Sequence, residues 1–271
     1  MKRIAVVILN WNGIELLKKF IPNTINNSEQ ANIYVIDNFS EDDSVDFLKR
    51  NYLNIKVIEL DKNYGFAEGY NLGLKEIDEE IYCLINSDIK VTKNWLEPVI
   101  NNFDNNNVSI AQPIILDYNK EDHFEYAGAA GGFIDKFGYP FCRGRIINSI
   151  EKNLNQYKDS KIFWATGACL FVKRRVFNEL NGFDKDFFAH QEEIDFCTDD
   201  PSNMETYIKT LFPHLNEQGR EMVYKAGYYI SIADGDLDDR EEKLLQKIAQ
   251  ILQLSSAHCK GIIAEIHGNE A

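Results

Sequence analysis

The feature that most constrains the fold is a repeated alternation of apolar and helical segments over the first 90 residues. The apolar segments have the near-continuous hydrophobic pattern of strands buried on both faces, and they lie at residues 3–9, 32–36, 55–60 and 81–85. Helical spacing occurs between them at residues 14–20, 44–51 and in the stretch that ends near Ile77. This alternation predicts an α/β fold with a mostly parallel, doubly wound sheet.

Three of the predicted strands end in polar residues. The first ends in Asn10-Trp11-Asn12, the second in Asp37-Asn38-Phe39-Ser40 and the fourth in Asn86-Ser87-Asp88. Because the carboxyl ends of parallel strands meet at one edge of a sheet, we expect these side chains to gather there. One polar tip is ordinary turn chemistry, but three on the same edge indicate a binding site.

The fourth strand delivers a carboxylate, Asp88, to this edge. A carboxylate oxygen is a hard ligand suited to Mg²⁺ or Mn²⁺ that carries a diphosphate. The alternative is that Asn86 and Asp88 form an Asx turn without a ligand. The glycines of residues 63–73 would let the backbone approach a ligand. Their spacing is not that of a dinucleotide-binding fingerprint, and the chain has no Gly-Lys-Ser/Thr sequence of a P-loop.

Composition limits the classes of partner. The chain has 271 residues and a formal net charge of −14, which argues against nucleic acid. An acidic protein that handles a phosphorylated substrate usually needs a bridging cation. The five cysteines are far apart without a CxxC pair, which indicates reduced thiols in a cytoplasmic protein. No apolar run approaches the roughly 20 residues of a membrane span, and the N-terminus is expected to be a strand, not a signal peptide.

The middle of the chain is less regular. Residues 92–112 predict a helix followed by a strand at residues 108–112. The glycine-bearing residues 117–160 are either a mobile loop over a site or a plain surface insertion. In the apolar segment that follows, at residues 162–172, the small Gly167 would let a substrate approach closely. A short helix is then predicted at residues 176–180, and Asn181-Gly182 ends it.

Residues 1–197 resemble a family 2 glycosyltransferase of the rhamnosyltransferase-like kind, with a GT-A fold. The resemblance rests on seven blocks in the family's order, at residues 6–13, 35–40, 63–71, 84–88, 164–170, 182–188 and 192–195. It implies an inverting, metal-dependent transfer of a sugar from a nucleotide-diphosphate sugar to a hydroxyl. The acceptor would be a saccharide or a lipid-linked saccharide, in cell-surface polysaccharide synthesis. The implied location is the cytoplasm, with attachment to the inner face of the membrane as an alternative.

The resemblance also assigns site residues. Asn86-Ser87-Asp88 occupies the place of the family's metal-binding DXD motif, with Asn in place of its first Asp, so Asp88 would bind Mg²⁺ or Mn²⁺ directly. Asp37 would touch the nucleobase, and residues 63–71 would border the nucleotide-sugar. The full predicted nucleotide-sugar set is Asn10, Asn12, Asp37, Asn38, Ser40, Asn63, Gly65, Phe66, Asn71, Asn86, Ser87 and Gly167.

Inverting transfer also needs a carboxylate that takes the proton of the acceptor hydroxyl. Glu193 lies where the family places this base, although Glu replaces the usual Asp. Glu192 and Asp195 are the alternatives for the base, and a solvated acidic helix start is the alternative without function. The neighbouring His190 is more often a surface residue than a ligand.

The tail follows a different pattern. Residues 198–203 have the composition of a linker, and residues 204–271 predict helices at residues 205–211, 217–233, 240–253 and 257–266. The segment from Ile230 to Glu242, with the helix after it, is similar to tellurite-resistance TerB-like helical domains. Such a module would serve dimerisation or protein docking. Residues 234–238 fail the EF-hand template, because Asp239 and Leu245 stand where Gly and Glu are needed.

The junction at residues 198–203 leaves two interpretations open. The protein is a natural fusion that carries a shortened transferase, or it is a transferase that has lost its last segment and with it part of the acceptor site. The second interpretation predicts a catalytically incomplete module that binds nucleotide-sugars and presents a helical docking domain.

Overall fold

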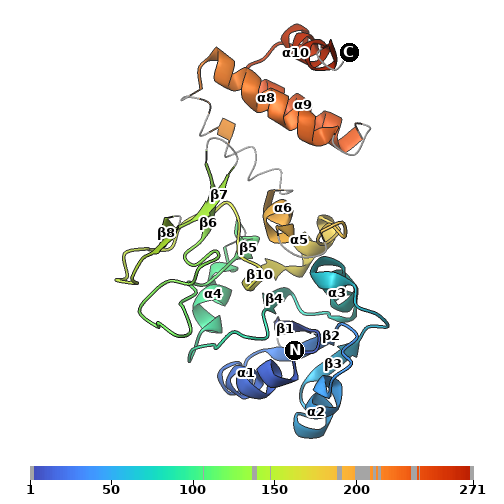
Figure 1. Ribbon diagram of the computed structural model, residues 1–271, viewed down its shortest axis with the longest axis vertical. Coiled ribbons are helices and arrows are strands. Elements are labelled where there is room, and N and C mark those ends of the chain that lie inside the picture. Colours follow the sequence, from blue (N-terminus) through green and yellow to red (C-terminus); the bar gives the residue numbers. More distant parts are fainter. Residues whose placement is uncertain are drawn as a thin grey trace. The chain divides into compact units, whose positions relative to one another are not determined.

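The computed structural model describes residues 3–105, 107–135, 139–146, 148–187, 191–198, 208–209, 212, 215–232, 237 and 239–268. Contacts within the chain divide it into two compact units, Met1–Cys197 and Thr198–Ala271 (Figure 1).

The first unit is built on a six-stranded sheet with the order β3-β2-β1-β4-β10-β5 (Figure 1). Its strands are β1 Ile4–Asn10, β2 Asn32–Asp37, β3 Lys56–Glu59, β4 Ile81–Ile85, β5 Ile110–Ala111 and β10 Cys169–Lys173. The pairs β3–β2, β2–β1 and β1–β4 are parallel, whereas β10 is antiparallel to both β4 and β5. The predicted mostly parallel sheet is therefore confirmed.

Helices cover both faces of this sheet, which explains the continuous apolar pattern of its strands. They are α1 Ile14–Asn27, α2 Ser44–Asn51, α3 Gly65–Gly73 with the 3-10 turn η1 Leu74–Glu76, α4 Leu96–Asn102, α5 Arg174–Glu179 and α6 Glu192–Thr198. Alternate β1 residues enter two separate core clusters. Val6 packs with Leu17 of α1 in the first cluster, and Val7 packs with Tyr70 of α3 in the second.

Two helix boundaries differ from the prediction for physical reasons. The first helix continues past residue 20 and through Pro22, because Ile21 and Thr24 extend its buried face. The fourth begins at Leu96 and not at residue 92, because Asn94 has a left-handed φ of 58° that a helix cannot contain.

Residues 117–160 contain strands that neither sequence interpretation anticipated. β6 Gly132–Ile134 pairs with β7 Pro140–Cys142, and β8 Arg145–Ile146 pairs with β9 Ser149–Ile150. The buried residues Phe124, Ala129 and Ala130 form a small core of their own. This segment, together with its flanks at residues 114–164, is called the insertion below.

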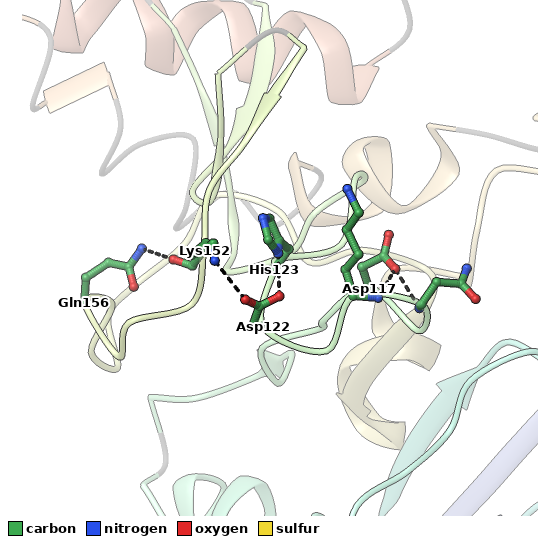
Figure 2. A network of polar contacts seen from close by, with 7 residues as sticks. Asp117, Asp122, His123, Lys152 and Gln156 are labelled. Atoms are coloured by element: carbon green, nitrogen blue, oxygen red, sulfur yellow. Dashed lines mark hydrogen bonds and ion pairs between the residues drawn. The ribbon is translucent and has the colours of Figure 1, made fainter.

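A network of polar contacts joins two segments of the insertion, at residues 122–123 and 152 (Figure 2). The Asp122 carboxylate lies between His123 (2.7 Å to Nδ1) and Lys152 (3.1 Å to Nζ). The hydrogen bond to His123 and the one to Lys152 lower the pKa of Asp122. Asp117 accepts hydrogen bonds from the backbone N–H groups of Asn119 and Lys120, and so caps the turn that precedes this pair.

In the described part of the second unit, the helices α8 Glu217–Ser231, α9 Asp239–Ile251 and α10 Ser256–Gly268 pack around an apolar core that also includes Ile208. Its buried side chains include Tyr224, Leu245 and Ile262, one from each helix. Of the predicted helix at residues 205–211, residues 208 and 209 are described and helical. His190, most of the residues 198–203 and all but residue 237 of the segment 234–238 lie outside the described residues.

All five cysteines are buried, and among the described residues they form no disulfide bond. Among the residues that the structure describes, none of the helices has the length and apolar character needed to cross a membrane.

Candidate active site

The strand order places a topological switch point at β1, since β2 lies on one side of it and β4 on the other. Ligands of open α/β sheets bind beyond the carboxyl ends of the strands at such a point. Asn10 and Asp37 are register partners at the ends of β1 and β2, and Ile8 pairs with Ile85 at the end of β4. The three polar tips therefore meet at one edge, as the sequence predicts.

Asp37 organises the tips of β1 and β2. Its buried carboxylate accepts hydrogen bonds from Asn10 Nδ2 (3.0 Å), Ser40 Oγ (2.7 Å) and the Ser40 N–H (2.9 Å). Ser40 Oγ also accepts the Asn12 N–H at 2.9 Å. Since a carboxylate offers about four acceptor positions, these three bonds leave room at Asp37 for one further donor, such as an N–H of a nucleobase.

Two exposed aromatic side chains stand beside this network and were absent from the predicted site. Trp11 is 58% exposed and Phe39 is 49% exposed. Phe39 has a left-handed φ of 65°, an uncommon conformation for an aromatic residue. The sequence contained a signal for both, because each is an aromatic residue inside a polar strand tip, where neither core packing nor turn formation requires one.

Asn38 and Asn63 are placed to shape the loop that leads into α3. Asn38 is buried, and its Nδ2 donates to Asn63 Oδ1 (2.9 Å) and to the Gly65 carbonyl (2.8 Å) while its Oδ1 accepts the Tyr64 N–H (2.9 Å). Asn63 Oδ1 also accepts the Gly65 N–H at 2.9 Å. Their amides thus hold the backbone around Gly65, whose φ is +77°.

Asn71 joins α3 to the segment that precedes α6. Its Nδ2 donates to the Phe183 carbonyl at 2.7 Å, and its Oδ1 accepts the Phe183 N–H at 2.9 Å. The adjacent Gly182 has a left-handed φ of 79°, and a Cβ there would lie 2.3 Å from Asn71 Oδ1. The geometry therefore gives Asn71 a positioning role beside the predicted nucleotide-sugar region.

Replacing Asn71 by Ala would leave two backbone groups of Phe183 without their amide partner. We expect the free energy of unfolding to fall by about 2 kcal/mol, measured by urea denaturation. Asn51→Ala is a matched control, because Asn51 is exposed and donates to the Phe47 carbonyl of its own helix. Equal losses in the two variants would contradict the positioning role.

The tip of β4 contains the predicted metal ligand. Asn86 and Ser87 are half-buried, Asp88 is exposed, and the Ile89 N–H to Asn86 carbonyl bond (3.3 Å) closes a turn around them. The described residues contain no group of three or more His, Cys, Asp or Glu able to hold a metal. Mg²⁺ is commonly bound through one or two carboxylates plus substrate phosphates, so a single exposed carboxylate fits a cation that arrives with a diphosphate.

The segment at residues 166–168 lies between this tip and Glu192 of α6. The Asn86 N–H donates to the Ala168 carbonyl at 3.1 Å. A Cβ added to Gly167 would lie 3.4 Å from Phe66 and 3.8 Å from Glu192 Oε1, so Phe66 and Glu192 both approach Gly167.

The three candidate bases on α6 differ in exposure. Glu192 is buried, whereas Glu193 and Asp195 are partly exposed. Phe196 and Cys197 at the end of the helix join the second core cluster and fix α6 on the sheet. Burial raises the pKa of Tyr70 on the facing helix α3, and the nearby Glu192 carboxylate acts in the same direction.

Comparison with solved structures defines the fold. The chain matches GalNAc-T7 with UDP, GalNAc and Mn²⁺ with a TM-score of 0.57 and 16% identity, over 73% of this chain and 40% of that one. It matches the mannosyltransferase PcManGT from Pyrobaculum calidifontis, in complex with GDP-Man and Mn²⁺, with a TM-score of 0.52 and 12% identity, over 98% and 75%. The predicted GT-A fold is confirmed.

The family follows from the sequence comparisons. The family described as "Glycosyl transferase family 2" matches residues 5–180, which is more than half of the chain, so the chain belongs to this family. The family described as "Tellurite resistance protein TerB" matches residues 180–263. Although this second match begins before α6, the packing of Phe196 and Cys197 places that helix in the first unit.

Two relatives illustrate the family. The hexosyltransferase Agl10 of low-salt glycan biosynthesis in Haloferax volcanii is 24% identical over 199 residues, which are 72% of this chain and 60% of that protein. The rhamnosyltransferase WbbL of Escherichia coli (strain K12) is 22% identical over 204 residues, which are 72% and 75%. The chain thus spans less than two thirds of the length of Agl10.

Proposed function

We propose that the chain is an inverting glycosyltransferase that moves a sugar from a nucleotide-diphosphate sugar to a hydroxyl of a saccharide or lipid-linked saccharide. The observation that carries the proposal is the segment at residues 166–168, which is hydrogen-bonded to Asn86 at the tip of β4 and is approached by Glu192 of α6. Transfer requires a carboxylate for a cation and a carboxylate for a proton in one region, and this segment brings both elements together. Relatives in glycan biosynthesis support a role in cell-surface polysaccharide synthesis.

Donor binding would use the tips of β1 and β2. Asp37 would accept a hydrogen bond from the base with its remaining acceptor position, and the exposed Trp11 would stack on the base. The diphosphate would lie toward β4, where Asp88 would hold Mg²⁺ or Mn²⁺. When bound, the cation neutralises the charge that develops on the departing nucleotide diphosphate. The Mn²⁺ in two structures of the same fold supports this assignment.

Glu193 is the proposed base. On a helix, neighbouring residues point about 100° apart, so Glu192 and Glu193 face different directions. Glu192 is buried with its Oε1 near Gly167, whereas Glu193 is partly exposed as a residue with its Oε2 buried, so an acceptor hydroxyl would approach its Oε1. Glu193 would take the hydroxyl proton as the oxygen attacks the anomeric carbon.

Trp11→Ala is expected to weaken nucleotide-sugar binding by about 1–3 kcal/mol, because base stacking on an aromatic ring is worth roughly that much. Isothermal titration with UDP- and GDP-sugars in Mn²⁺ measures the change. Trp11→Phe, which keeps an aromatic face, should retain most of the affinity. If Trp11→Ala binds as tightly as the wild type, the stacking role is excluded.

A second candidate function is a nucleotide-sugar-binding module without transfer activity. It is favoured by the end of the family match at residue 180, ahead of the carboxylates of α6. A thermal-shift donor screen with and without Mn²⁺ detects binding in either case, because a bound ligand raises stability by mass action. A product assay with the same donors then separates the two functions, since binding without product supports the module.

In both cases we infer that the helical unit serves dimerisation or protein docking.

A further inference from the structure

The chain leaves the sheet for the insertion and returns from it at neighbouring places. β5 ends at Ala111 and β10 begins at Cys169, and Ala111 is the register partner of Phe171, so the outgoing and returning segments lie side by side (Figure 1). The return passes through residues 166–168, the segment that is hydrogen-bonded to the tip of β4. The position of this segment therefore depends on how the two ends of the insertion are joined.

One side-chain amide, that of Gln112, joins these two ends. Gln112 is half-buried and follows β5 directly. Its Oε1 accepts the Thr166 N–H at 2.8 Å, although Thr166 lies 54 residues further along the chain. Its Nε2 donates to the Gly128 carbonyl at 2.8 Å, inside the insertion. The amide thus holds both ends of the insertion and a point within it, and the three residues Gln112, Gly128 and Thr166 are called the clasp below.

The clasp is closely packed as well as hydrogen-bonded. Thr166 is buried, and a Cβ added to Gly128 would lie 2.5 Å from the Thr166 Cβ. Gly128 also has a left-handed φ of 99°, so a residue without a side chain is required there. Because the amide of Gln112 must accept from an N–H and donate to a carbonyl, it fits the clasp in one orientation only. A carboxylate or an apolar side chain could not make both bonds.

A short series of hydrogen bonds connects the clasp to the candidate site. Thr166 Oγ1 accepts the Ala168 N–H at 3.3 Å, and the Ala168 carbonyl accepts the Asn86 N–H at 3.1 Å. Between these two residues lies Gly167, which Glu192 Oε1 approaches. Because all three positions belong to consecutive residues, a shift of the backbone at Thr166 also moves the contact with the β4 tip and the contact with α6.

We propose that Gln112 is a positioning residue of the transfer reaction, a role that rests on the proposed function. It acts through Thr166 and not on the reacting atoms: its amide fixes residues 166–168, and with them the separation between the β4 tip and α6. A misplacement of about 1 Å at a catalytic site can cost roughly a hundredfold in rate. The polar groups at the tips of β1, β2 and β4 keep their local hydrogen bonds when the clasp opens, so donor affinity should not change.

Gln112→Met tests this role, because it removes both hydrogen bonds of the amide and keeps a side chain of similar length. We expect kcat to fall about tenfold while donor affinity, measured by titration without acceptor, stays unchanged. Gln156→Met is the matched control. Gln156 lies inside the insertion, where it accepts the Leu154 N–H at 2.7 Å and donates to the Lys152 carbonyl at 2.9 Å. It makes the same two kinds of bond away from residues 166–168, so its kcat should equal that of the wild type.

Gly128→Ala opens the clasp from its other side, and Gly144→Ala is its control. Both glycines have a left-handed φ, of 99° and 89°, and a Cβ would lie 2.5 Å from Thr166 at Gly128 and 2.7 Å from Phe124 at Gly144. The local strain is similar, but only Gly128 meets the returning segment. We expect kcat of Gly128→Ala to be about tenfold below that of Gly144→Ala. This pair decides the test if Gln112→Met does not fold, and thermal unfolding verifies that each assayed variant is folded.

A merely structural clasp would lower the Tm of Gln112→Met and leave kcat of the folded variant unchanged, and this result would overturn the positioning role. Equal kcat losses in Gln112→Met and Gln156→Met would overturn it too, as would a loss of donor affinity without a loss of kcat. In each of these cases the wild type still forms product, so the proposed transfer stands. A wild type that forms no product contradicts the transfer itself, and the positioning role with it.

Discussion

Asp88→Ala is expected to lower nucleotide-sugar affinity in Mn²⁺ about a hundredfold, which corresponds to roughly 3 kcal/mol. The reason is that Asp88 is the exposed carboxylate at the tip of β4 and the proposed protein ligand of the cation that carries the diphosphate. Without this carboxylate, the cation would lose its proposed protein ligand, and the acidic protein would bind the negatively charged diphosphate more weakly. Isothermal titration in Mn²⁺, in Mg²⁺ and in a chelator measures the difference.

The matched control is Asp78→Ala. Asp78 precedes β4, at the opposite end of the same strand, and pairs with Arg174 at 2.8 Å on the surface. This variant removes a surface carboxylate just before the strand without touching the candidate edge, so its donor affinity should equal that of the wild type. If Asp88→Ala keeps its Mn²⁺-dependent affinity, the cation is held elsewhere and the β4 tip is a plain Asx turn.

The sheet and its polar edge could be predicted because the signals for both are local. A strand buried on two faces is continuously apolar, and its end is marked by the residues that form the turn. The four parallel strands lie within two residues of the predicted bounds at each end, with the second helix at Ser44–Asn51 as predicted. The position of the three tips on one edge then follows from the topology of parallel strands.

The partners of individual site residues could not be predicted, because they are distant in sequence. Asn71 bonds to Phe183, 112 residues away, and nothing near Asn71 indicates this contact. The side-chain amide of Asn38 likewise forms its hydrogen bonds with the loop at residues 63–65. The family resemblance placed both beside the nucleotide-sugar, whereas their hydrogen bonds give them the role of holding the backbone around the site.

The insertion escaped prediction for another reason. Its strands are two or three residues long, which is too short to show a period of two, and its small core rests on Phe124, Ala129 and Ala130. Its glycines are read from sequence as loop residues. In the structure some of them permit close packing, as at Gly132, where a Cβ would lie 2.0 Å from the Trp164 ring.

Glu193→Gln is expected to lower kcat by about 10²–10⁴-fold, the usual contribution of a positioned general base, while donor affinity stays unchanged. The amide keeps the size of the side chain but cannot take the acceptor proton. Turnover with a fixed donor and a series of hydroxyl acceptors measures kcat, and titration of the same variant measures donor binding.

Glu192→Gln and Asp195→Asn separate the three carboxylates of α6. Glu192 is buried with its Oε1 near Gly167, so its amide variant should change the fit of the donor or acceptor and alter KM more than kcat. Asp195→Asn should retain most activity, because Asp195 lies on the face of α6 shared with Glu192 and not with Glu193. Full turnover in Glu193→Gln, together with a large loss of kcat in one of the other two, would move the base to that residue and leave the proposed transfer intact.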